Sequence, residues 1–448
     1  MTDAIQFPLT QPELVQEVSG VTLRRTVHPS GLRVLTEHTP GARSVSIGFW
    51  VPVGSRDEQA DDSGKAGSLG STHFLEHLLF KGTPTRSAYD IADAFDRLGA
   101  DHNALTAKEF TCYHAKVRDL DLPKAVTVLT DMVTNSVLDQ QEFETERGVI
   151  LEELAMAADD LSDVAHEQFF QAVLGSHPLG RPIGGTPHTI REAARDAVFE
   201  HYRARYAPPT LVVTAAGAVD HDALVEMLVT ELADTGGVWD PSVVRDPHPR
   251  RDREPAKITD AVADFRVEKP SEQVHLVLGS QGLPAGDSRR FAFGLMNAVL
   301  GGGMSSRLFQ EIREKRGLAY SAYSFGGSYS DAGVFGMYAA CNPEKAGEVL
   351  TLASAELEKL ADTGVTESER SRALGQIAGS SALALEDNDT RMGRLARAEL
   401  GTGELFDLDR SLERFRAVTN DEIRDMAATL LEQVSTRVVV GSIAGTGL

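Results

Sequence analysis

The chain repeats one order of strands and helices on either side of a segment rich in proline, glycine and charge. In each half a strand leads into a helix and then into a Glu-x-Glu-Arg stretch, at 142–147 and again at 367–370. The intervening segment, 236–260, has the composition of an interdomain linker. A chain of 448 residues is long enough for two domains. We therefore predict two homologous domains, an N-terminal one at 1–235 and a C-terminal one at 261–448.

The order of the predicted elements indicates the fold class. In the first half, alternating hydrophobic patterns predict strands at 21–27, 32–36 and 44–51, and helical patterns at 88–98 and 122–135 follow them. Strands grouped before helices are typical of α+β proteins rather than of βαβ repeats. Each domain is therefore predicted to be a mainly antiparallel β-sheet with helices packed on one face.

Charge and cysteine content exclude several classes of protein. The 44 basic and 66 acidic residues give a net charge of −22, with no Lys/Arg run that would indicate a nucleic-acid partner. Cys112 and Cys341 lie far apart with no CxxC, which excludes a disulfide scaffold and fits a reducing compartment. Neither a secretory signal pattern nor a membrane-spanning apolar stretch is visible. We therefore predict a cytoplasmic protein without membrane or nucleic-acid partners.

The segment His73-Phe74-Leu75-Glu76-His77 carries the chemistry that the sequence predicts. On a helix, His73 and His77 lie one turn apart on the same face, where two imidazoles can bind one Zn²⁺. Glu76 lies beside them and can act on a water molecule as a general base. Two ordinary histidines on a short helix are the alternative. A metal-storage role would give Glu76 no function.

A catalytic zinc needs a third protein ligand. The predicted helix at 140–157 offers acidic candidates, because Glu146 and Glu153 lie two turns apart within an apolar stripe. The commoner interpretation is an amphipathic helix whose acidic residues face water. Spacing alone does not choose between Glu146, Glu152 and Glu153.

At these residues the sequence resembles the pitrilysin-type (inverzincin) zinc metallopeptidases, and most of all their mitochondrial processing peptidase branch and its bacterial relatives. The resemblance covers nearly the whole chain from about residue 23, and it depends on separated segments at 73–83, 103–106, 146–153, 177–186 and 301–309. The loop at 61–70, before the metal-binding helix, looks longer than the usual approach in that family.

The resemblance implies a role for each residue that matches the family pattern. It makes His73, His77 and Glu153 the ligands of one zinc per chain, with Glu76 as the general base. It also makes Glu146 a carboxylate that supports the metal site from behind, a function that metal centres need.

Further residues follow from the same resemblance. Asn103 and Ala104 match an edge strand that pairs with an extended substrate, and Phe80 is predicted to contact substrate with them. Arg313 and Tyr320 match an arginine and a tyrosine that approach the scissile carbonyl, where both can donate to an oxyanion. In short chains of the family two subunits face each other, so we expect a homodimer, or else a heterodimer, in which these two residues act on the partner's zinc.

The predicted function is that of a zinc-dependent endopeptidase, which hydrolyses peptides or unfolded segments in an enclosed chamber through a water molecule activated by zinc and Glu76. The alternative is a non-catalytic structural or peptide-binding subunit of the same family. A complete set of His73, His77, Glu76 and Glu153 favours the enzyme, because a scaffold has no physical need for all four.

Overall fold

The computed structural model describes residues 4–59 and 68–448, and these form two compact units. Unit 1 contains the described residues of Met1–Leu154, Arg181–Arg251 and Leu383–Asp407, and unit 2 contains Ala155–Gly180, Asp252–Ala382 and Leu408–Leu448. Each unit therefore includes a segment from the opposite half of the sequence. Most of the loop at 61–70, which the sequence suggested to be long, lies outside the described residues.

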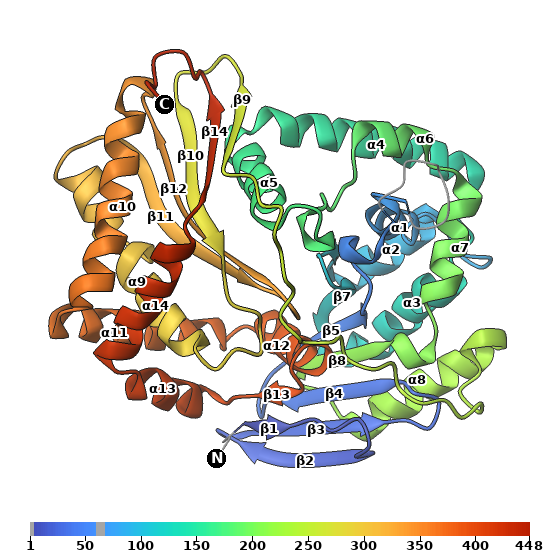
Figure 1. Cartoon of the computed structure of the whole chain (residues 1–448). Helices are drawn as coiled ribbons and strands as arrows, with labels where there is room; N and C mark the ends of the chain where they lie inside the picture. Colours follow the sequence, from blue (N-terminus) through green and yellow to red (C-terminus); the bar gives the residue numbers. More distant parts are fainter. Residues whose placement is uncertain (1–3, 60–67) are drawn as a thin grey trace. The chain divides into compact units, whose positions relative to one another are not determined.

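Unit 1 contains a seven-stranded sheet (Figure 1). Its strands, in spatial order, are β2 (Glu13–Val18), β3 (Val21–Val27), β4 (Arg33–His38), β8 (Val212–Gly217), β5 (Ser44–Val51), β7 (Thr111–Arg118) and β6 (Asp101–Thr106). Only the pair β4–β8 is parallel, and the other neighbours are antiparallel. A short strand pair, β1 (Ile5–Gln6) and β13 (Glu404–Leu405), lies apart from this sheet.

Unit 2 contains a five-stranded sheet. Its strands, in spatial order, are β11 (Ala319–Ser328), β12 (Gly333–Cys341), β10 (Val274–Gln281), β14 (Thr436–Gly441) and β9 (Asp264–Glu268). Here too only one pair, β14–β9, is parallel. The mixed composition and the mainly antiparallel sheets confirm the predicted α+β fold class.

The two sheets share one topology. Read from the edge, the order β6-β7-β5-β8-β4 in unit 1 matches the order β11-β12-β10-β14-β9 in unit 2. The strand directions agree as well, including the parallel pair at the end of each series. Because both the order and the direction of five strands coincide, the structure supports the internal duplication that the sequence suggested.

Fourteen α-helices complete the described part of the chain. They are α1 (Ser71–Leu78), α2 (Ala88–Leu98), α3 (Leu122–Asn135), α4 (Gln140–Asp159), α5 (Leu161–Leu174), α6 (Pro187–Glu192), α7 (Arg195–Arg205), α8 (His221–Thr235), α9 (Arg290–Gly301), α10 (Ala346–Thr363), α11 (Glu367–Ala384), α12 (Asn388–Leu400), α13 (Leu408–Ala417) and α14 (Asn420–Gln433).

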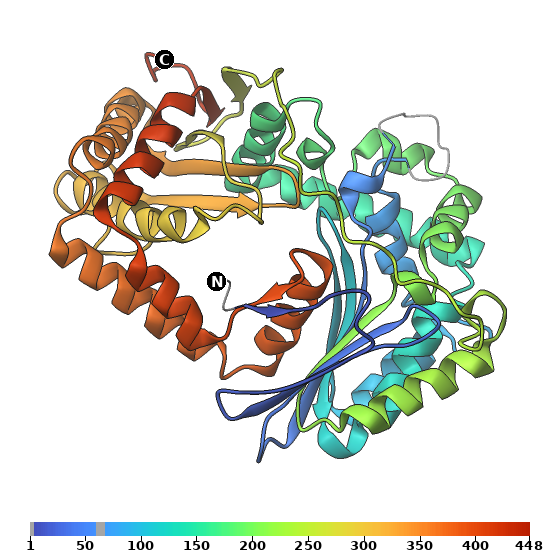
Figure 2. The same cartoon turned by 60° about the horizontal axis from the view of Figure 1, so that its bottom comes forward.

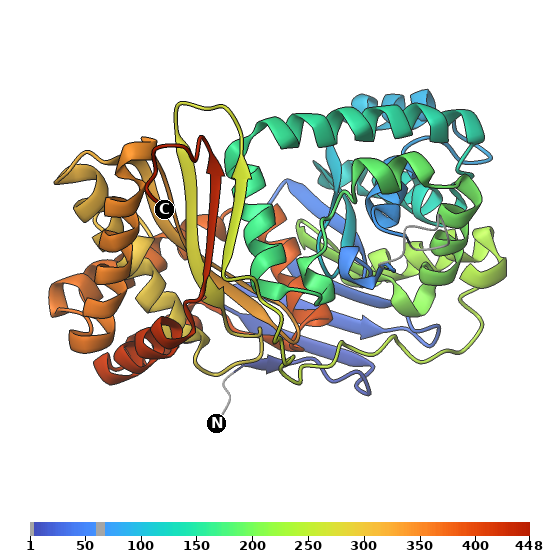
Figure 3. The same ribbon diagram turned by 45° about the horizontal axis from the view of Figure 1, so that its top comes forward.

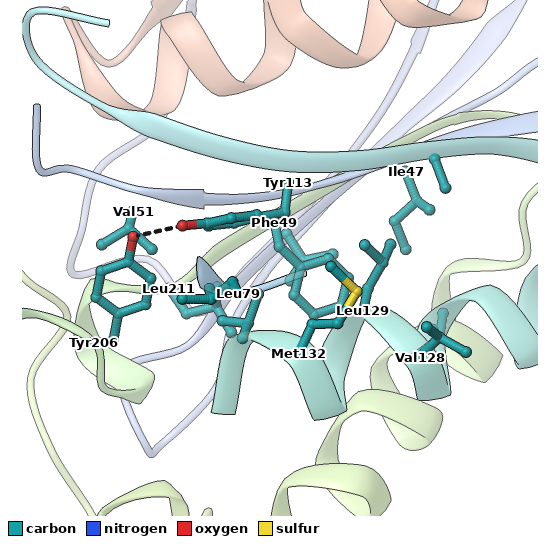
Figure 4. Close-up of a cluster of buried hydrophobic side chains, with 14 of the residues drawn as sticks. Ile47, Phe49, Val51, Leu79, Tyr113, Val128, Leu129, Met132, Tyr206 and Leu211 are labelled. Carbon is teal, nitrogen blue, oxygen red and sulfur yellow. Dashed lines mark hydrogen bonds between the residues drawn. The ribbon is translucent and has the colours of Figure 1, made fainter. Parts of the chain in front are cut away.

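One face of the seven-stranded sheet packs on helices of the first half of the chain. In Figure 2, α3 and α8, in teal and light green, run along this face. Phe49 and Tyr113 project from the sheet onto Met132 of α3, and the Tyr113 hydroxyl hydrogen-bonds the Tyr206 hydroxyl at 3.1 Å (Figure 4). This apolar layer also contains Leu75 and Leu78 of α1, so the helix that carries the histidines is anchored in the main core.

The opposite face of each sheet is covered by a helix from the other half of the sequence. In unit 1, α12 packs on β4, β5 and β8, with Met392 and Leu395 against Trp50. In unit 2, α5 packs on β9, β10 and β14 (Figure 3), with Phe169 among the buried residues. The two helices occupy equivalent places in the duplicated order, because α5 follows the long helix α4 and α12 follows the long helix α11.

Helices therefore lie on both faces of each sheet, and the prediction from the sequence that they pack on one face is wrong in this respect. The reason is visible in β5. Ile47 and Phe49 point to one face and join one hydrophobic cluster, whereas Trp50 points to the opposite face and joins another. Successive side chains of a strand point to opposite faces, so a strand that is apolar at consecutive positions needs cover on both.

The segment at 236–260 divides between the two units after Arg251. Arg251 binds both carboxylate oxygens of Asp57, at 2.8 and 2.6 Å, and also donates to the main-chain oxygen of Pro52. Its charge is thus used to attach the segment to unit 1. Part of the charge that suggested an interdomain linker is therefore used, at Arg251, in an ion pair with this unit.

Candidate metal centre

Helix α1 presents the three motif residues on one side. Phe74, Leu75 and Leu78 are fully buried, whereas His73, Glu76 and His77 are only partly buried. This division follows from the helical period, because positions three and four apart lie on the same face. The apolar side anchors the helix in the core, and the opposite side exposes two imidazoles and a carboxylate.

Helix α4 is attached to α1 through aromatic packing. The ring of Phe143 stacks on the ring of Phe74, with 4.2 Å between centroids and 14° between planes. The Arg147 guanidinium lies over the Phe143 ring, 5.0 Å from its centroid, and donates to the main-chain oxygen of Ala193 at 2.8 Å. These contacts fix the rotation of α4 and so determine which of its acidic residues face α1.

Glu153 is the acidic residue that reaches both histidines. Its Oε2 lies 3.7 Å from Nε2 of His73 and 3.6 Å from Nε2 of His77. Among the described residues, His73, His77 and Glu153 form the one group whose possible ligand atoms all lie within 4.8 Å of one another. Two imidazole nitrogens and one carboxylate oxygen are a donor set that suits zinc, and three protein ligands leave a coordination position for water or substrate.

Glu146 lies behind the histidines and is almost completely buried. Its Oε2 is 2.9 Å from Nδ1 of His77, and its Oε1 is 2.7 Å from Nζ of Lys81. The hydrogen bond places the proton of His77 on Nδ1, so that Nε2 faces Glu153 with a free lone pair. The orientation of His77 therefore fits a metal ligand. Lys81, which carries no local signal in the sequence, balances the buried charge of Glu146.

Glu76 does not belong to the three-residue group, and its side chain is held separately. The Thr106 hydroxyl, at the end of β6, donates a hydrogen bond to Oε2 of Glu76. Burial raises the pKa of Glu76, while the bond from Thr106 and the nearby His77 oppose that rise. Burial, followed by the neighbouring imidazole of His77, lowers the pKa of His73 and favours the neutral form that binds metals.

The predicted substrate-contacting residues lie on β6, whose Thr106 binds Glu76, and directly after α1. Asn103 and Ala104 belong to β6, which is the last strand of its sheet, and the Ala104 N–H donates to Oδ1 of Asn103 at 2.9 Å. Phe80 is half-buried, and its ring lies 6.3 Å from that of Tyr113 and 6.2 Å from that of His102. β6 thus offers an edge to an extended chain, whereas Phe80 partly packs against the core.

Arg313 and Tyr320 belong to unit 2, and the structure brings these two together. Arg313 lies on a short π-helix (Phe309–Glu314), an irregularity often found at functional positions. Its guanidinium lies over the Tyr320 ring, 4.2 Å from the centroid, and Nη1 donates to the Tyr320 main-chain oxygen at 3.0 Å. Tyr320 is 72% exposed, so its hydroxyl is available to a ligand.

No helix within residues 4–59 and 68–448 is long and apolar enough to cross a lipid bilayer.

Comparisons with known proteins identify the family. Residues 33–187 match the model of Insulinase (Peptidase family M16), and residues 193–377 match that of the Peptidase M16 inactive domain. An uncharacterized zinc protease of Streptomyces coelicolor is 44% identical over 96% of this chain and 92% of its own length. An uncharacterized zinc protease of Mycobacterium tuberculosis is 42% identical over 93% of this chain and 93% of its own length. One of Bacillus subtilis is 34% identical over 92% of this chain and 96% of its own length.

Solved structures show the same fold. A peptidase M16 inactive domain from Pseudomonas fluorescens superposes with a TM-score of 0.82 at 19% identity, over 94% of this chain and 97% of its own. A protease from Helicobacter pylori superposes with a TM-score of 0.80 at 22% identity, over 93% of this chain and 98% of its own. The comparisons support the family as a whole, and the processing-peptidase branch stays a prediction. The chain belongs to peptidase family M16, the insulinase family.

Proposed function

We propose that the chain is a zinc-dependent endopeptidase whose active site is formed by His73, His77, Glu153 and Glu76. The observation that carries the proposal is the approach of Glu153 to both Nε2 atoms, with a separately held carboxylate, Glu76, on the same face of α1. Zinc bound by the three ligands would supply Lewis-acid chemistry, which lowers the pKa of a water molecule and polarises the scissile carbonyl.

The protein's own residues would perform the proton transfers. Glu76 takes a proton from the attacking water and delivers it to the leaving amine nitrogen. Its raised pKa makes it a stronger base than an exposed glutamate, and the Thr106 hydroxyl orients the carboxylate. Substrate would pair with the free edge of β6 at Asn103 and Ala104, which orders an extended peptide beside Glu76.

The first test is the cleavage of a mixed peptide library by the purified chain, with products identified by mass spectrometry. We expect cuts at internal bonds of peptides and unfolded segments. Release of single terminal residues would contradict an endopeptidase. Zinc binding without any cleavage would instead support a non-catalytic, peptide-binding subunit.

Replacing Glu146 with Gln tests the support of His77. We expect the affinity for zinc to fall about 10- to 100-fold, because the orienting carboxylate of a metal-bound histidine is lost. Competition with a fluorescent zinc chelator measures the dissociation constant. Glu152→Gln is the matched control on the same helix, because Glu152 is exposed. Equal affinities of Glu146→Gln and the wild type would contradict the assignment.

Arg313→Ala and Tyr320→Phe test the predicted stabilisation of the oxyanion. Removing one such donor typically lowers kcat about 10²- to 10³-fold, so each variant should lose activity while its zinc affinity stays unchanged. Arg316→Ala, a neighbouring arginine paired with Glu311, and Tyr89→Phe, an exposed tyrosine, are the controls. Full activity in both variants would remove these residues from the mechanism.

The homodimer also belongs to this proposal. If Arg313 and Tyr320 act on the zinc of a second subunit, mixing an Arg313→Ala chain with a Glu76→Gln chain should restore activity above that of either variant alone. No restoration, in a mixture shown to contain mixed dimers, would contradict action between subunits.

A further inference from the structure

Two buried titratable side chains behind the N-terminus of α1 are not used by the proposed chemistry. Glu58 is 3% exposed and His201, on α7, is 4% exposed. Thr72 connects them, because its N–H donates to Glu58 and its hydroxyl is 3.2 Å from Nε2 of His201. Burial lowers the pKa of His201 to about 4, so this imidazole is neutral at physiological pH.

Glu58 caps the first turn of α1. Its Oε2 accepts the N–H of Gly70 at 2.8 Å, and its Oε1 accepts the N–H of Thr72 at 2.7 Å. The first N–H groups of a helix have no partner within the helix, and a buried helix end must find partners elsewhere.

The residue at the N-cap position cannot provide this cap itself. Gly70 has a φ of 88°, and a Cβ at this position would lie 2.6 Å from Cδ1 of Ile190 and 2.9 Å from the main-chain oxygen of Gly184. Tight packing therefore excludes the Ser, Asp or Asn that normally caps a helix from this position. The acceptor comes instead from Glu58, twelve residues earlier in the chain.

Glu58 is itself held in place from several directions. The Arg181 guanidinium donates to the main-chain oxygen of Glu58 and, at 3.3 Å, to that of Arg56. Lys108 in turn donates to the main-chain oxygen of Arg181. Burial is the largest cause that raises the pKa of Glu58, to about 8, while the two backbone N–H groups and Arg181 act in the opposite direction. The structure thus keeps a costly buried carboxyl group at this point. Within the described residues, its side-chain oxygens accept main-chain hydrogen bonds from the start of α1, at Gly70 and Thr72.

We propose that Glu58 is a positioning residue for the metal centre: by binding the N–H groups of Gly70 and Thr72, it fixes the first turn of α1 and hence the direction of His73. His73 follows Thr72 directly, so a shift or fraying of this turn moves one of the three metal-binding atoms. The inference rests on the proposed zinc site. Metal ligands must be held to within a fraction of an ångström, and the groups that hold them contribute strongly to metal affinity.

The test is the isosteric variant Glu58→Gln. Its amide can accept one of the two N–H groups but turns an NH₂ donor toward the other. We expect zinc affinity to fall about 10- to 100-fold, measured by chelator competition well below the unfolding temperature. The visible absorption of the Co²⁺-loaded protein should change as well, because it reports the ligand geometry directly.

A matched control separates positioning from general stability. Glu422 caps α14 in unit 2, where its Oε2 accepts the N–H of Thr419 at 2.7 Å. Glu422→Gln makes the same chemical change at another helix end, where the amide oxygen can still accept the N–H of Thr419, so zinc affinity and the Co²⁺ spectrum should stay unchanged. If Glu58→Gln does not give native circular dichroism, Glu58→Asp replaces it, with the carboxyl group kept and the reach shortened by one methylene.

The outcomes distinguish this inference from the proposed function. Weakened zinc binding in the folded Glu58 variant supports the inference even if the wild type cleaves no peptide, in which case only the peptidase proposal fails. A folded Glu58 variant that binds zinc as tightly as the wild type, with an unchanged Co²⁺ spectrum, overturns the inference and leaves the peptidase proposal intact. A wild type that binds no zinc overturns both.

Discussion

Replacing Glu76 with Gln is expected to lower kcat for peptide cleavage by between about 10² and 10⁴, with zinc still bound. The amide keeps the size of the side chain and can still accept the hydrogen bond from Thr106. It cannot take a proton from water at neutral pH. Because the group His73, His77 and Glu153 does not include Glu76, the affinity for zinc should not change.

The measurement is the initial rate on a quenched fluorescent peptide, with zinc content determined on the same samples. Glu152→Gln again serves as the control, since it changes an exposed glutamate that does not belong to the donor group. Activity of Glu76→Gln within a few-fold of the wild type would remove Glu76 as the general base. Loss of zinc from this variant would show that Glu76 is a ligand, which contradicts the assignment.

Replacing Glu399 with Ala is expected to lower the free energy of unfolding of unit 1 by about 3–5 kcal/mol. Glu399 lies on α12 and is completely buried. Its carboxylate binds Nε of Arg25 at 2.9 Å, Nη1 of Arg33 at 3.2 Å and Nη2 of Arg250 at 3.2 Å. Arg25 and Arg33 are buried as well, so the substitution leaves two guanidinium groups without their counter-charge in the interior.

The chain contains a convenient probe for this effect. Both of its tryptophans, Trp50 and Trp239, belong to unit 1, and Trp50 lies in the hydrophobic cluster beneath α12. Urea unfolding followed by tryptophan fluorescence therefore reports unit 1 without a contribution from unit 2. Glu226→Ala, on an exposed face of α8 within the same unit, is the control and should change stability by less than about 0.5 kcal/mol. A loss below about 1 kcal/mol in Glu399→Ala would contradict a structural role for this ion cluster.

The sequence contained much of the candidate metal site, because helix periodicity alone places His73, Glu76 and His77 on one face. It could not choose among the acidic residues of α4. That choice depends on the rotation of α4, which the stacking of Phe143 on Phe74 and the contacts of Arg147 determine. The resemblance to a known family pointed to Glu153, and the structure places Glu153 beside both histidines with Glu146 behind His77.

Other features depend on contacts between distant residues and left no local signal. In the sequence, three such polar residues look ordinary. In the folded chain Thr106 binds Glu76, Lys81 pairs with Glu146, and Glu58 caps the start of α1. The assignment of α5 to unit 2 and of α12 to unit 1 also left no local signal in the sequence. The pattern of a helix shows that one side is apolar, but not which sheet covers it.

The most direct test of the metal-centre proposal is a titration of metal-free protein with zinc, with cleavage of a quenched fluorescent peptide as the readout. We predict no cleavage without metal, a rise in activity with added zinc, and saturation at one zinc per chain. Cleavage by the metal-free protein, or no cleavage at any amount of zinc that binds, would contradict the assignment of His73, His77, Glu153 and Glu76 as the active site of a zinc peptidase.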